Sequence, residues 1–206
     1  MQDRGKDHWD TVYSEKSQSQ LSWHQDDPTA SVKLCTLAGI TPATSVIDIG
    51  GGRSPLAAQL VDKGLKDITV LDISRVALEK AREAMGGNAA RITWTVADIT
   101  RWTPTRTYDI WHDRAVFHFL TVTADQEAYL ARMKRALGSG GHAIIATFAP
   151  DGPETCSGLP VMRYSPDSLS ERLGPGYTRL ADRAIRHETP WGSAQSFQFS
   201  LFRRLA

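Results

Sequence analysis

Four aspartates, each at or just beyond the end of a strand-like run, constrain the fold of this sequence more than any other feature. Asp48 precedes three glycines in residues 46–52 (VIDIGGG), and Asp72, Asp98 and Asp113 follow the next three runs. Helix-like segments separate these runs, which is typical of a parallel sheet covered on both faces. Because the carboxyl ends of parallel strands line one crevice in such a sheet, we expect the four carboxylates to converge on one ligand site.

The order of the expected elements indicates an α/β fold with a doubly wound, mostly parallel sheet and an antiparallel edge. Strands are expected at residues 44–49, 67–72, 91–96, 108–112, 142–148, 177–186 and 195–203. No convincing helix separates the last two strands, so we expect them to pair antiparallel. Helices are expected at residues 28–38, 54–64, 74–85, 115–120, 123–137 and 165–173, and Thr123 and Gln126 have the spacing of a capping box.

The length of 206 residues suits a single domain, and we expect residues 1–206 to form one. Within it, residues 1–40 are expected to make a helical lid and residues 41–150 the ligand-binding core. Residues 151–206 are expected to supply a substrate loop and the antiparallel edge of the sheet.

Composition excludes several classes of protein. The net charge of +1 argues against a nucleic-acid binder held by a basic surface. No run of eighteen apolar residues is present, so no membrane span is expected. Residues 1–20 are polar, which predicts no secretory signal. The two cysteines, Cys35 and Cys156, have neither disulfide-framework nor metal-site spacing, so a cytoplasmic protein without a metal is expected.

The residues around Asp48 favour one adenosine-containing ligand over another. A dinucleotide site normally follows G-x-G-x-x-G with an apolar residue in place of Asp48, but Pro55 occupies the third glycine position here. A carboxylate beside the glycine turn would repel a pyrophosphate, whereas it suits an ammonium group and a positively charged sulfur, as in S-adenosyl-L-methionine. Asp72 suits the two ribose hydroxyls, because an ionised carboxylate accepts hydrogen bonds from both. Asp98 suits the adenine amine.

With these residues in place, the chain resembles the class I S-adenosylmethionine-dependent methyltransferases, which have a Rossmann-like seven-stranded sheet. The matching segments stand in family order and spacing at residues 46–52, 71–72, 97–99, 108–113 and 140–145. The resemblance implies a methyltransferase that converts S-adenosyl-L-methionine to S-adenosyl-L-homocysteine. The residues expected to bind this cofactor are Trp9, Tyr13, Trp23, Asp48, Gly50, Gly51, Gly52, Ser54, Asp72, Ile73, Asp98, Ile99 and Asp113. Ser54 replaces the family's usual third alternating glycine, and a serine there can still donate to the methionine carboxylate.

Residues 111–118 (WHDRAVFH) are the most distinctive stretch for the choice of methyl acceptor. They lack the Asn/Asp-Pro-Pro-Tyr/Phe pattern of nucleic-acid and glutamine-amide methyltransferases, so those acceptors are disfavoured. The Asp113-Arg114 pair and the opening segment from Trp9 to Tyr13 are similar to small protein-lysine methyltransferases, and the tryptophan-rich opening is also similar to thiopurine and thiol S-methyltransferases. We therefore expect a small-molecule acceptor, a thiol or sulfide or similar, with a protein lysine as the alternative.

Asp113, Arg114 and His118 are expected to carry the chemistry. Asp113 should lie beside the methionine part and the transferred methyl group, and Arg114 should bind the methionine carboxylate or a substrate anion. His118 lies one turn later and is a candidate general base. The alternatives are an Asp113-Arg114 ion pair that locks the loop and a His118 that packs beneath it. His112 is expected to point away from Asp113 and to be structural.

Three aromatic side chains in the polar opening segment, Trp9, Tyr13 and Trp23, are expected to form a lid. An aromatic face attracts a cation, and a closed lid excludes water. Cys156, in the loop after the fifth strand, is expected to be a buried, inert thiol. Two other classes stay open: an NAD-dependent oxidoreductase on the same fold, and a cofactor-binding protein without catalysis.

Overall fold

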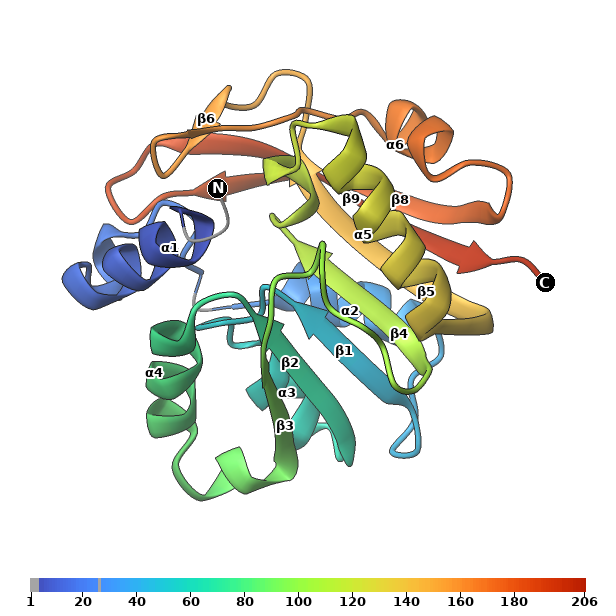
Figure 1. Cartoon of the computed structure of the whole chain (residues 1–206), viewed down its shortest axis with the longest axis horizontal. Coiled ribbons are helices and arrows are strands. Elements are labelled where there is room, and N and C mark those ends of the chain that lie inside the picture. The colour runs from blue at the N-terminus through green and yellow to red at the C-terminus, as the bar shows by residue number, and fades with distance from the viewer. Residues whose placement is uncertain (1–3, 26) are drawn as a thin grey trace.

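A seven-stranded sheet runs through the molecule in the order β3-β2-β1-β4-β5-β9-β8 (Figure 1). The computed structural model describes residues 4–25 and 27–206. The strands of this sheet are β1 (Ser45–Ile49), β2 (Asp67–Asp72), β3 (Ile92–Val96), β4 (Tyr108–Arg114), β5 (Leu137–Phe148), β8 (Tyr177–Glu188) and β9 (Ala194–Arg204). Strands β1 to β5 pair parallel with one another, and β9 runs antiparallel to both β5 and β8. The predicted mostly parallel sheet with an antiparallel edge is confirmed.

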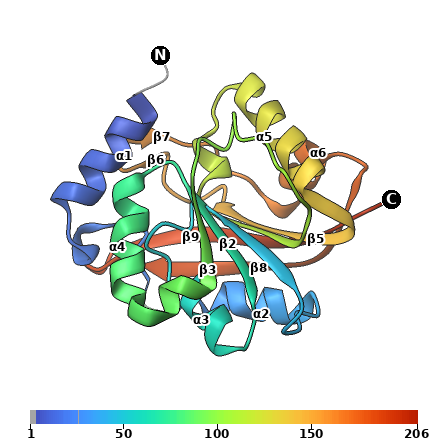
Figure 2. The ribbon, with the colours of Figure 1, turned by 60° about the horizontal axis from the view of Figure 1, so that its bottom comes forward.

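Helices cover both faces of the sheet (Figure 2). They are α1 (Arg4–Glu15), α2 (Thr29–Leu37), α3 (Leu56–Asp62), α4 (Arg75–Met85), α5 (Thr123–Ala136) and α6 (Pro166–Leu173), with short 3-10 turns η1 (Gln18–Gln20), η2 (Gly86–Arg91) and η3 (Phe117–Phe119). Helices α2 and α3 pack on one face, and α5 and α6 on the other. Side chains of β1 pack on both faces of the sheet. Val46 belongs to the core on the side of α2 and α3, and Ile47 and Ile49 belong to the core on the side of α5 and α6.

Strand β4 lies in the middle of the sheet, and its side chains serve the two faces alternately. Trp111 points towards α5, where its Nε1 donates a 2.7 Å hydrogen bond to the Tyr129 hydroxyl, and Asp113 accepts from the same hydroxyl. His112 points the other way, towards Ser31 on α2. The prediction that His112 and Asp113 point in opposite directions is confirmed.

The segment after β4 differs from the sequence prediction. β4 continues through Arg114, and the helix expected at residues 115–120 is only the turn η3. The reason is local: the Asp113 carboxylate accepts from the backbone N–H groups of Val116 and Phe117, and Ala115 takes a positive φ of 72°. A left-handed residue at this point cannot belong to a right-handed helix.

Three expected helix termini also differ from the structure. Thr123 and Gln126 do not form a capping box, because the Gln126 amide donates to the carbonyl of Leu120 and its oxygen accepts from Arg172. Helix α5 ends at Ala136, one residue before the expected end at 137, and β5 follows it without a loop. Helix α3 begins at Leu56, two residues after the expected start at 54, and the Ser54 hydroxyl accepts a hydrogen bond from the Leu56 backbone N–H.

The opening segment is a packed element, because α1 lies beside α4 (Figures 1 and 2). Asp10 holds α1 against α4, because one of its carboxylate oxygens accepts a 2.6 Å hydrogen bond from the Ser74 hydroxyl at the start of α4. Val12, Tyr13 and Leu21 are buried in a small cluster with Ala77. Residues 1–3 and 26 of the expected lid lie outside the described residues.

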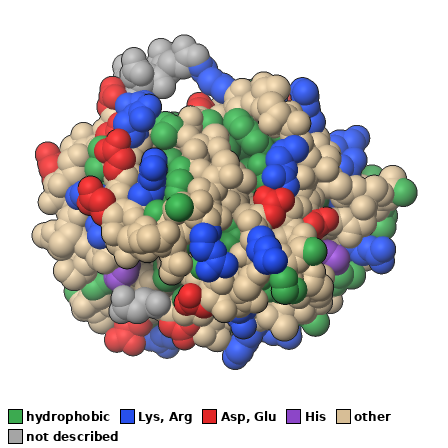
Figure 3. All heavy atoms as spheres, turned by 90° about the horizontal axis from the view of Figure 1, so that it is seen from below, with side chains coloured by type: hydrophobic (Ala, Val, Ile, Leu, Met, Phe, Trp, Pro, Cys, Tyr) green, Lys and Arg blue, Asp and Glu red, His purple; other side chains and the backbone are tan. Residues whose placement is uncertain are grey.

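The surface carries both signs of charge. Figure 3 shows one face, on which Lys and Arg side chains are interspersed with Asp and Glu. Across residues 4–25 and 27–206, no helix has the length and apolar character needed to cross a bilayer.

Candidate active site

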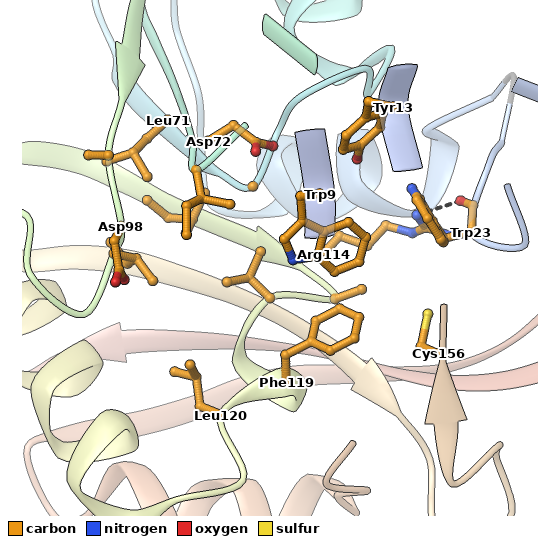
Figure 4. Close-up of a pocket in the computed structure, with 17 residues that line it drawn as sticks. Trp9, Tyr13, Trp23, Leu71, Asp72, Asp98, Arg114, Phe119, Leu120 and Cys156 are labelled. Atoms are coloured by element: carbon orange, nitrogen blue, oxygen red, sulfur yellow. Dashed lines mark hydrogen bonds between the residues drawn. The ribbon is translucent and has the colours of Figure 1, made fainter. Parts of the chain in front are cut away.

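A cavity of about 170 Å³ opens at the carboxyl ends of β1, β2 and β4 (Figure 4). Its walls come from the strand ends, from the opening segment and from the loop after β4. Many of the residues that the sequence singled out line it: Trp9, Tyr13, Trp23, Gly50, Asp72, Ile73, Asp98, Ile99 and Arg114. The expected convergence of two of the four strand-end carboxylates, Asp72 and Asp98, is therefore seen in this cavity.

A second, smaller cavity of about 50 Å³ continues from the first along the glycine turn. Asp48, Gly51 and Ser54 line it, and it shares Tyr13, Trp23, Gly50 and Arg114 with the larger one. Gly52 lines neither of these two cavities and lies against Asp72 instead.

The glycine turn brings the backbone close to two carboxylates. Gly50 has a φ of 64°, which glycine adopts without strain. A Cβ on Gly51 would stand 2.4 Å from Asp48 Oδ2, and one on Gly52 would stand 2.7 Å from Asp72 Oδ2. Side chains at these positions would therefore displace the carboxylates.

Asp72 ends β2 inside the crevice and is almost fully buried. One of its oxygens accepts a 2.8 Å hydrogen bond from the backbone N–H of Ser74. Burial raises the pKa of Asp72 to about 7, and the backbone hydrogen bonds from Ser74 and Gly52 oppose this shift only in part. The carboxyl therefore gains and loses its proton near neutral pH.

Asp98 is more exposed and shapes the loop after β3. Its Oδ1 accepts 2.8 and 2.7 Å bonds from the backbone N–H and hydroxyl of Thr100. Ile73 and Ile99 lie beside the two acids in the cavity wall. Together the two acids and the two isoleucines form one end of the cavity, which combines hydrogen-bond acceptors with apolar surface.

The opposite end of the cavity is aromatic. Trp9 packs edge-on against both Trp23 and Phe119, with ring centroids 5.5 and 5.1 Å apart. Tyr13 lies 6.2 Å from Trp9 and from Trp23. The predicted aromatic lid residues are thus brought together over the cavity, and Phe119 is an additional member (Figure 4).

Arg114 is the cation of this aromatic end. Its Nη1 donates a 2.9 Å bond to the Trp23 carbonyl, and its guanidinium carbon lies 5.0 Å from the Phe197 ring centroid. Its Nε is buried without a hydrogen-bond partner, and no carboxylate among the described residues lies within ion-pair distance of it. Burial lowers its pKa to about 10, so it keeps its charge at neutral pH. The ion pair with Asp113, which the sequence offers as the alternative to a binding role, is not formed.

The expectation that Asp113 lies beside the transferred methyl group is corrected by its position. Its side chain is fully buried on the α5 face of β4 and lines neither cavity. Besides the two N–H groups after β4, its Oδ2 accepts a 2.6 Å bond from Tyr129. Burial raises the pKa of Asp113 to about 6, while these donors favour the ionised form. Asp113 holds the turn that precedes η3.

His118 is likewise placed under the loop and away from both cavities, as the sequence alternative had it. It is fully buried against Phe119 and Phe148. Its Nδ1 accepts from the Phe148 N–H at 3.4 Å. Burial, with Arg114 nearby, lowers its pKa to about 3, so the imidazole is a very weak base near neutral pH. The expected general-base role does not fit this environment.

Sequence reasoning overlooked some of the lining. Phe119 and Leu120 reach the cavity because the chain turns sharply after β4. The sequence predicts a helix over this segment and therefore does not indicate the turn. Cys156 lines the cavity but is buried, and burial raises the pKa of its thiol to about 11, so it is not ionised at neutral pH. Its expected inert character agrees with this pKa.

The fold, the crevice and one family comparison define the class of protein. Residues 46–141 match a family model described as a methyltransferase domain. Residues 46–141 therefore carry a methyltransferase domain, and the fold is that of the class I S-adenosylmethionine-dependent methyltransferases, whose cofactor is S-adenosyl-L-methionine.

Curated relatives share part of this chain. The eEF1A lysine and N-terminal methyltransferase of Mus musculus is 26% identical over 141 residues, which cover 67% of this chain and 20% of that protein. The Drosophila melanogaster homolog is 23% identical over 147 residues, which cover 67% and 21%. The chain spans about one fifth of the length of these relatives.

Solved structures share the whole fold. One, titled for the conversion of a disulfide bond into a thioacetal group during echinomycin biosynthesis, has a TM-score of 0.75 and 24% identity, covering 97% of this chain and 93% of that one. The Burkholderia thailandensis 1,6-didemethyltoxoflavin-N1-methyltransferase has a TM-score of 0.71 and 18% identity, covering 98% and 84%. These similarities are similarities of fold.

Proposed function

We propose that this methyltransferase acts on the thiol or thiolate sulfur of a small, largely apolar acceptor. The observation that carries the proposal is the set of ionisable groups around the cavity. Asp72 and Asp98 lie at one end, and Arg114 and Cys156 at the other (Figure 4). Burial raises the pKa values of Tyr13 and Cys156, so neither is a ready base. An acceptor that ionises by itself, next to a cation, suits such a wall.

The residues present fit the cofactor. Asp48 Oδ2 is a buried carboxylate oxygen without a partner among the described residues, beside a turn that only glycine fits. We assign Asp48 to the ammonium group, Asp72 to the ribose hydroxyls and Asp98 to the adenine amine. When bound, the cofactor supplies a methyl group on a positively charged sulfur. Ile73 and Ile99 offer apolar contact to the adenine ring.

The remaining residues serve the acceptor. The aromatic rings of Trp9, Trp23 and Phe119 exclude water and hold an apolar acceptor in line with the methyl group. Arg114 stabilises negative charge on the acceptor sulfur, because a buried cation without a carboxylate partner favours the thiolate. This lowers the pKa of the bound thiol and removes the need for a general base.

A protein lysine is the second candidate, and two observations favour it. The curated relatives named above are lysine and N-terminal methyltransferases, and a box of aromatic rings attracts an ammonium group. Against it, a lysine must lose a proton before it accepts a methyl group. Neither His118 nor Asp113 lines the cavity, and Asp72, which does, is assigned to the ribose hydroxyls, so none of the three is placed to take that proton.

The test is a panel assay of S-adenosyl-L-homocysteine release with alkyl and aryl thiols, sulfide, amines of matched shape, and lysine-containing peptides. We expect turnover with thiols, with kcat/KM at least tenfold above that of the matched amines at pH 7.5. A pH–rate profile that levels off below the solution pKa of the thiol would support the role of Arg114. Turnover with lysine peptides alone would overturn the proposal in favour of the second candidate.

A further inference from the structure

A chain of three buried polar side chains links α2, β4 and β1 behind the glycine turn. His112 Nδ1 lies 2.7 Å from Asp48 Oδ1, and His112 Nε2 lies 2.8 Å from the Ser31 hydroxyl. Their exposed fractions are 1% for Ser31, 2% for Asp48 and 1% for His112. Three polar groups at this depth need a reason, since burying them costs free energy that only good hydrogen bonds recover.

The connectivity is that of a Ser-His-Asp hydrolase triad, but the surroundings exclude that chemistry. A nucleophilic serine must reach its substrate. Ser31 is buried and lines neither the larger nor the smaller cavity, whereas His112 and Asp48 both line the smaller one. The end of the chain that meets a cavity is therefore the carboxylate.

The two carboxylate oxygens of Asp48 differ in their hydrogen bonding. A carboxylate only accepts, so His112 donates from Nδ1 to Oδ1, and Nε2 is left to accept from the Ser31 hydroxyl in the neutral imidazole. Oδ2 has no partner among the described residues and lies against Gly51. With Oδ1 held from behind, the carboxylate cannot turn about its last bond, and Oδ2 stays at the cavity wall.

We propose that His112 is a positioning residue for the cofactor's ammonium group, acting through Asp48. Ser31 in turn fixes the ring orientation and tautomer of His112, as outer partners do for other ligating groups. This inference rests on the proposed cofactor role of Asp48. It adds that the affinity for the amino-acid part of the cofactor depends on His112, a residue that need not touch the cofactor.

Two probes separate this role from a general structural one. S-adenosyl-L-homocysteine carries the ammonium group, and 5′-methylthioadenosine has the same adenosine and sulfur without the amino-acid part. We would measure the binding of both by calorimetry at pH 7.5. His112→Leu should weaken S-adenosyl-L-homocysteine binding at least tenfold and change 5′-methylthioadenosine binding less than twofold.

Three variants complete the design. His112→Asn, whose amide can donate to Asp48 in place of Nδ1, should recover most of the lost affinity. Asp48→Asn should show the same selective loss as His112→Leu. His118→Leu is the matched control, because it makes the same change at a buried histidine away from both cavities, and it should leave the ratio of the two affinities unchanged.

The outcomes are distinct. If His112→Leu binds both probes as the wild type does, or weakens both equally, the positioning role is overturned. If Asp48→Asn keeps full affinity for S-adenosyl-L-homocysteine, it is overturned as well. If His112→Leu itself does not fold, His112→Asn and Asp48→Asn decide, and a loss in His112→Asn that is equal for both probes would overturn the proposal. None of these measurements uses a methyl acceptor, so a failed acceptor assay leaves the result standing.

Discussion

The guanidinium of Arg114 donates a 2.9 Å hydrogen bond to the backbone carbonyl of Trp23. This bond joins the last residue of β4 to the segment between α1 and α2, so the aromatic lid and the floor of the cavity are fastened to each other. The Nε of the same guanidinium has no hydrogen-bond partner within residues 4–25 and 27–206. One residue thus both holds the lid and places a positive charge in the wall of the cavity.

Replacing Arg114 is expected to reduce turnover through the acceptor. Arg114→Met removes the charge and keeps much of the volume, so kcat/KM for the best thiol should fall about tenfold to a hundredfold, the scale of a lost charge-assisted hydrogen bond. Arg114→Lys should lose less. The pH–rate profile is the decisive measurement: in Arg114→Met it should move towards the solution pKa of the thiol, and an unshifted profile would remove the thiolate role.

Asp72 is expected to make cofactor binding depend on pH. Its pKa is raised to about 7, and the ionised form is the better acceptor for two ribose hydroxyls. The affinity for S-adenosyl-L-homocysteine should therefore rise about tenfold from pH 6 to pH 8, as the ionised fraction grows. Calorimetry across this range checks the slope, and Asp72→Asn should bind more weakly with no such slope.

The same raised pKa has an opposite effect on the stability of the cofactor-free protein. Between the unfolded pKa of about 4 and the folded pKa of about 7, the folded chain holds a proton that the unfolded chain releases. The stability that this bound proton adds to the folded chain is complete below pH 4 and is lost as the pH rises through 7. The melting temperature of Asp72→Asn relative to wild type should therefore increase from pH 5 to pH 8, and a constant difference would contradict the raised pKa.

Asp113 is expected to matter for folding more than for chemistry. Asp113→Ala leaves two backbone N–H groups and the Tyr129 hydroxyl without their acceptor, at a cost of about 3–5 kcal/mol in the free energy of unfolding. Asp113→Asn keeps an accepting oxygen and should lose less. Urea unfolding without cofactor measures both. An Asp113→Asn protein of wild-type stability that had lost turnover a hundredfold would restore the catalytic interpretation.

His118 is expected to leave the pH dependence of the reaction unchanged. With a pKa lowered to about 3, it stays neutral throughout the working range. His118→Leu should keep the shape of the pH–rate profile between pH 6 and pH 9 and change kcat less than about threefold, because it removes only an acceptor for the Phe148 N–H. If His118→Leu abolished a fall in rate on the acidic side of the profile, the imidazole would be shown to move a proton.

The sequence predicted the sheet well because its signals are local and repeated. Each of the first four parallel strands is a short apolar run that ends at, or is soon followed by, an acid or a glycine, and the antiparallel pair β8 and β9 lacks a helix between its strands. The cavity residues contributed by strand ends, such as Asp72 and Asp98, followed from that pattern. The sharp turn after β4 could not be predicted, because it depends on the Asp113 carboxylate reaching two N–H groups further along the chain.

The roles of the ionisable groups were harder to predict, because they depend on how deeply each side chain is buried. Asp113 and His118 have the chemistry of catalytic groups in the sequence, and only the packing of α5 and of Phe148 around them shows that they serve the core. His112 was judged structural because it points away from Asp113, and that direction is the one that brings it to Asp48. Contacts between residues so distant in sequence leave no local pattern.

The alternation along β4 makes different demands on neighbouring positions. A library that randomises residues 110–114 one at a time should tolerate few changes at the buried positions 110–113 and more at Arg114. Selection for folding alone would bear on Trp111 and Asp113, whose partners are in the core, whereas selection for a new acceptor would act first on Arg114 if this residue faces the acceptor as we propose. Because these requirements fall on opposite sides of one strand, acceptor preference could diverge between descendants of this enzyme while the α5 side of the sheet stayed the same.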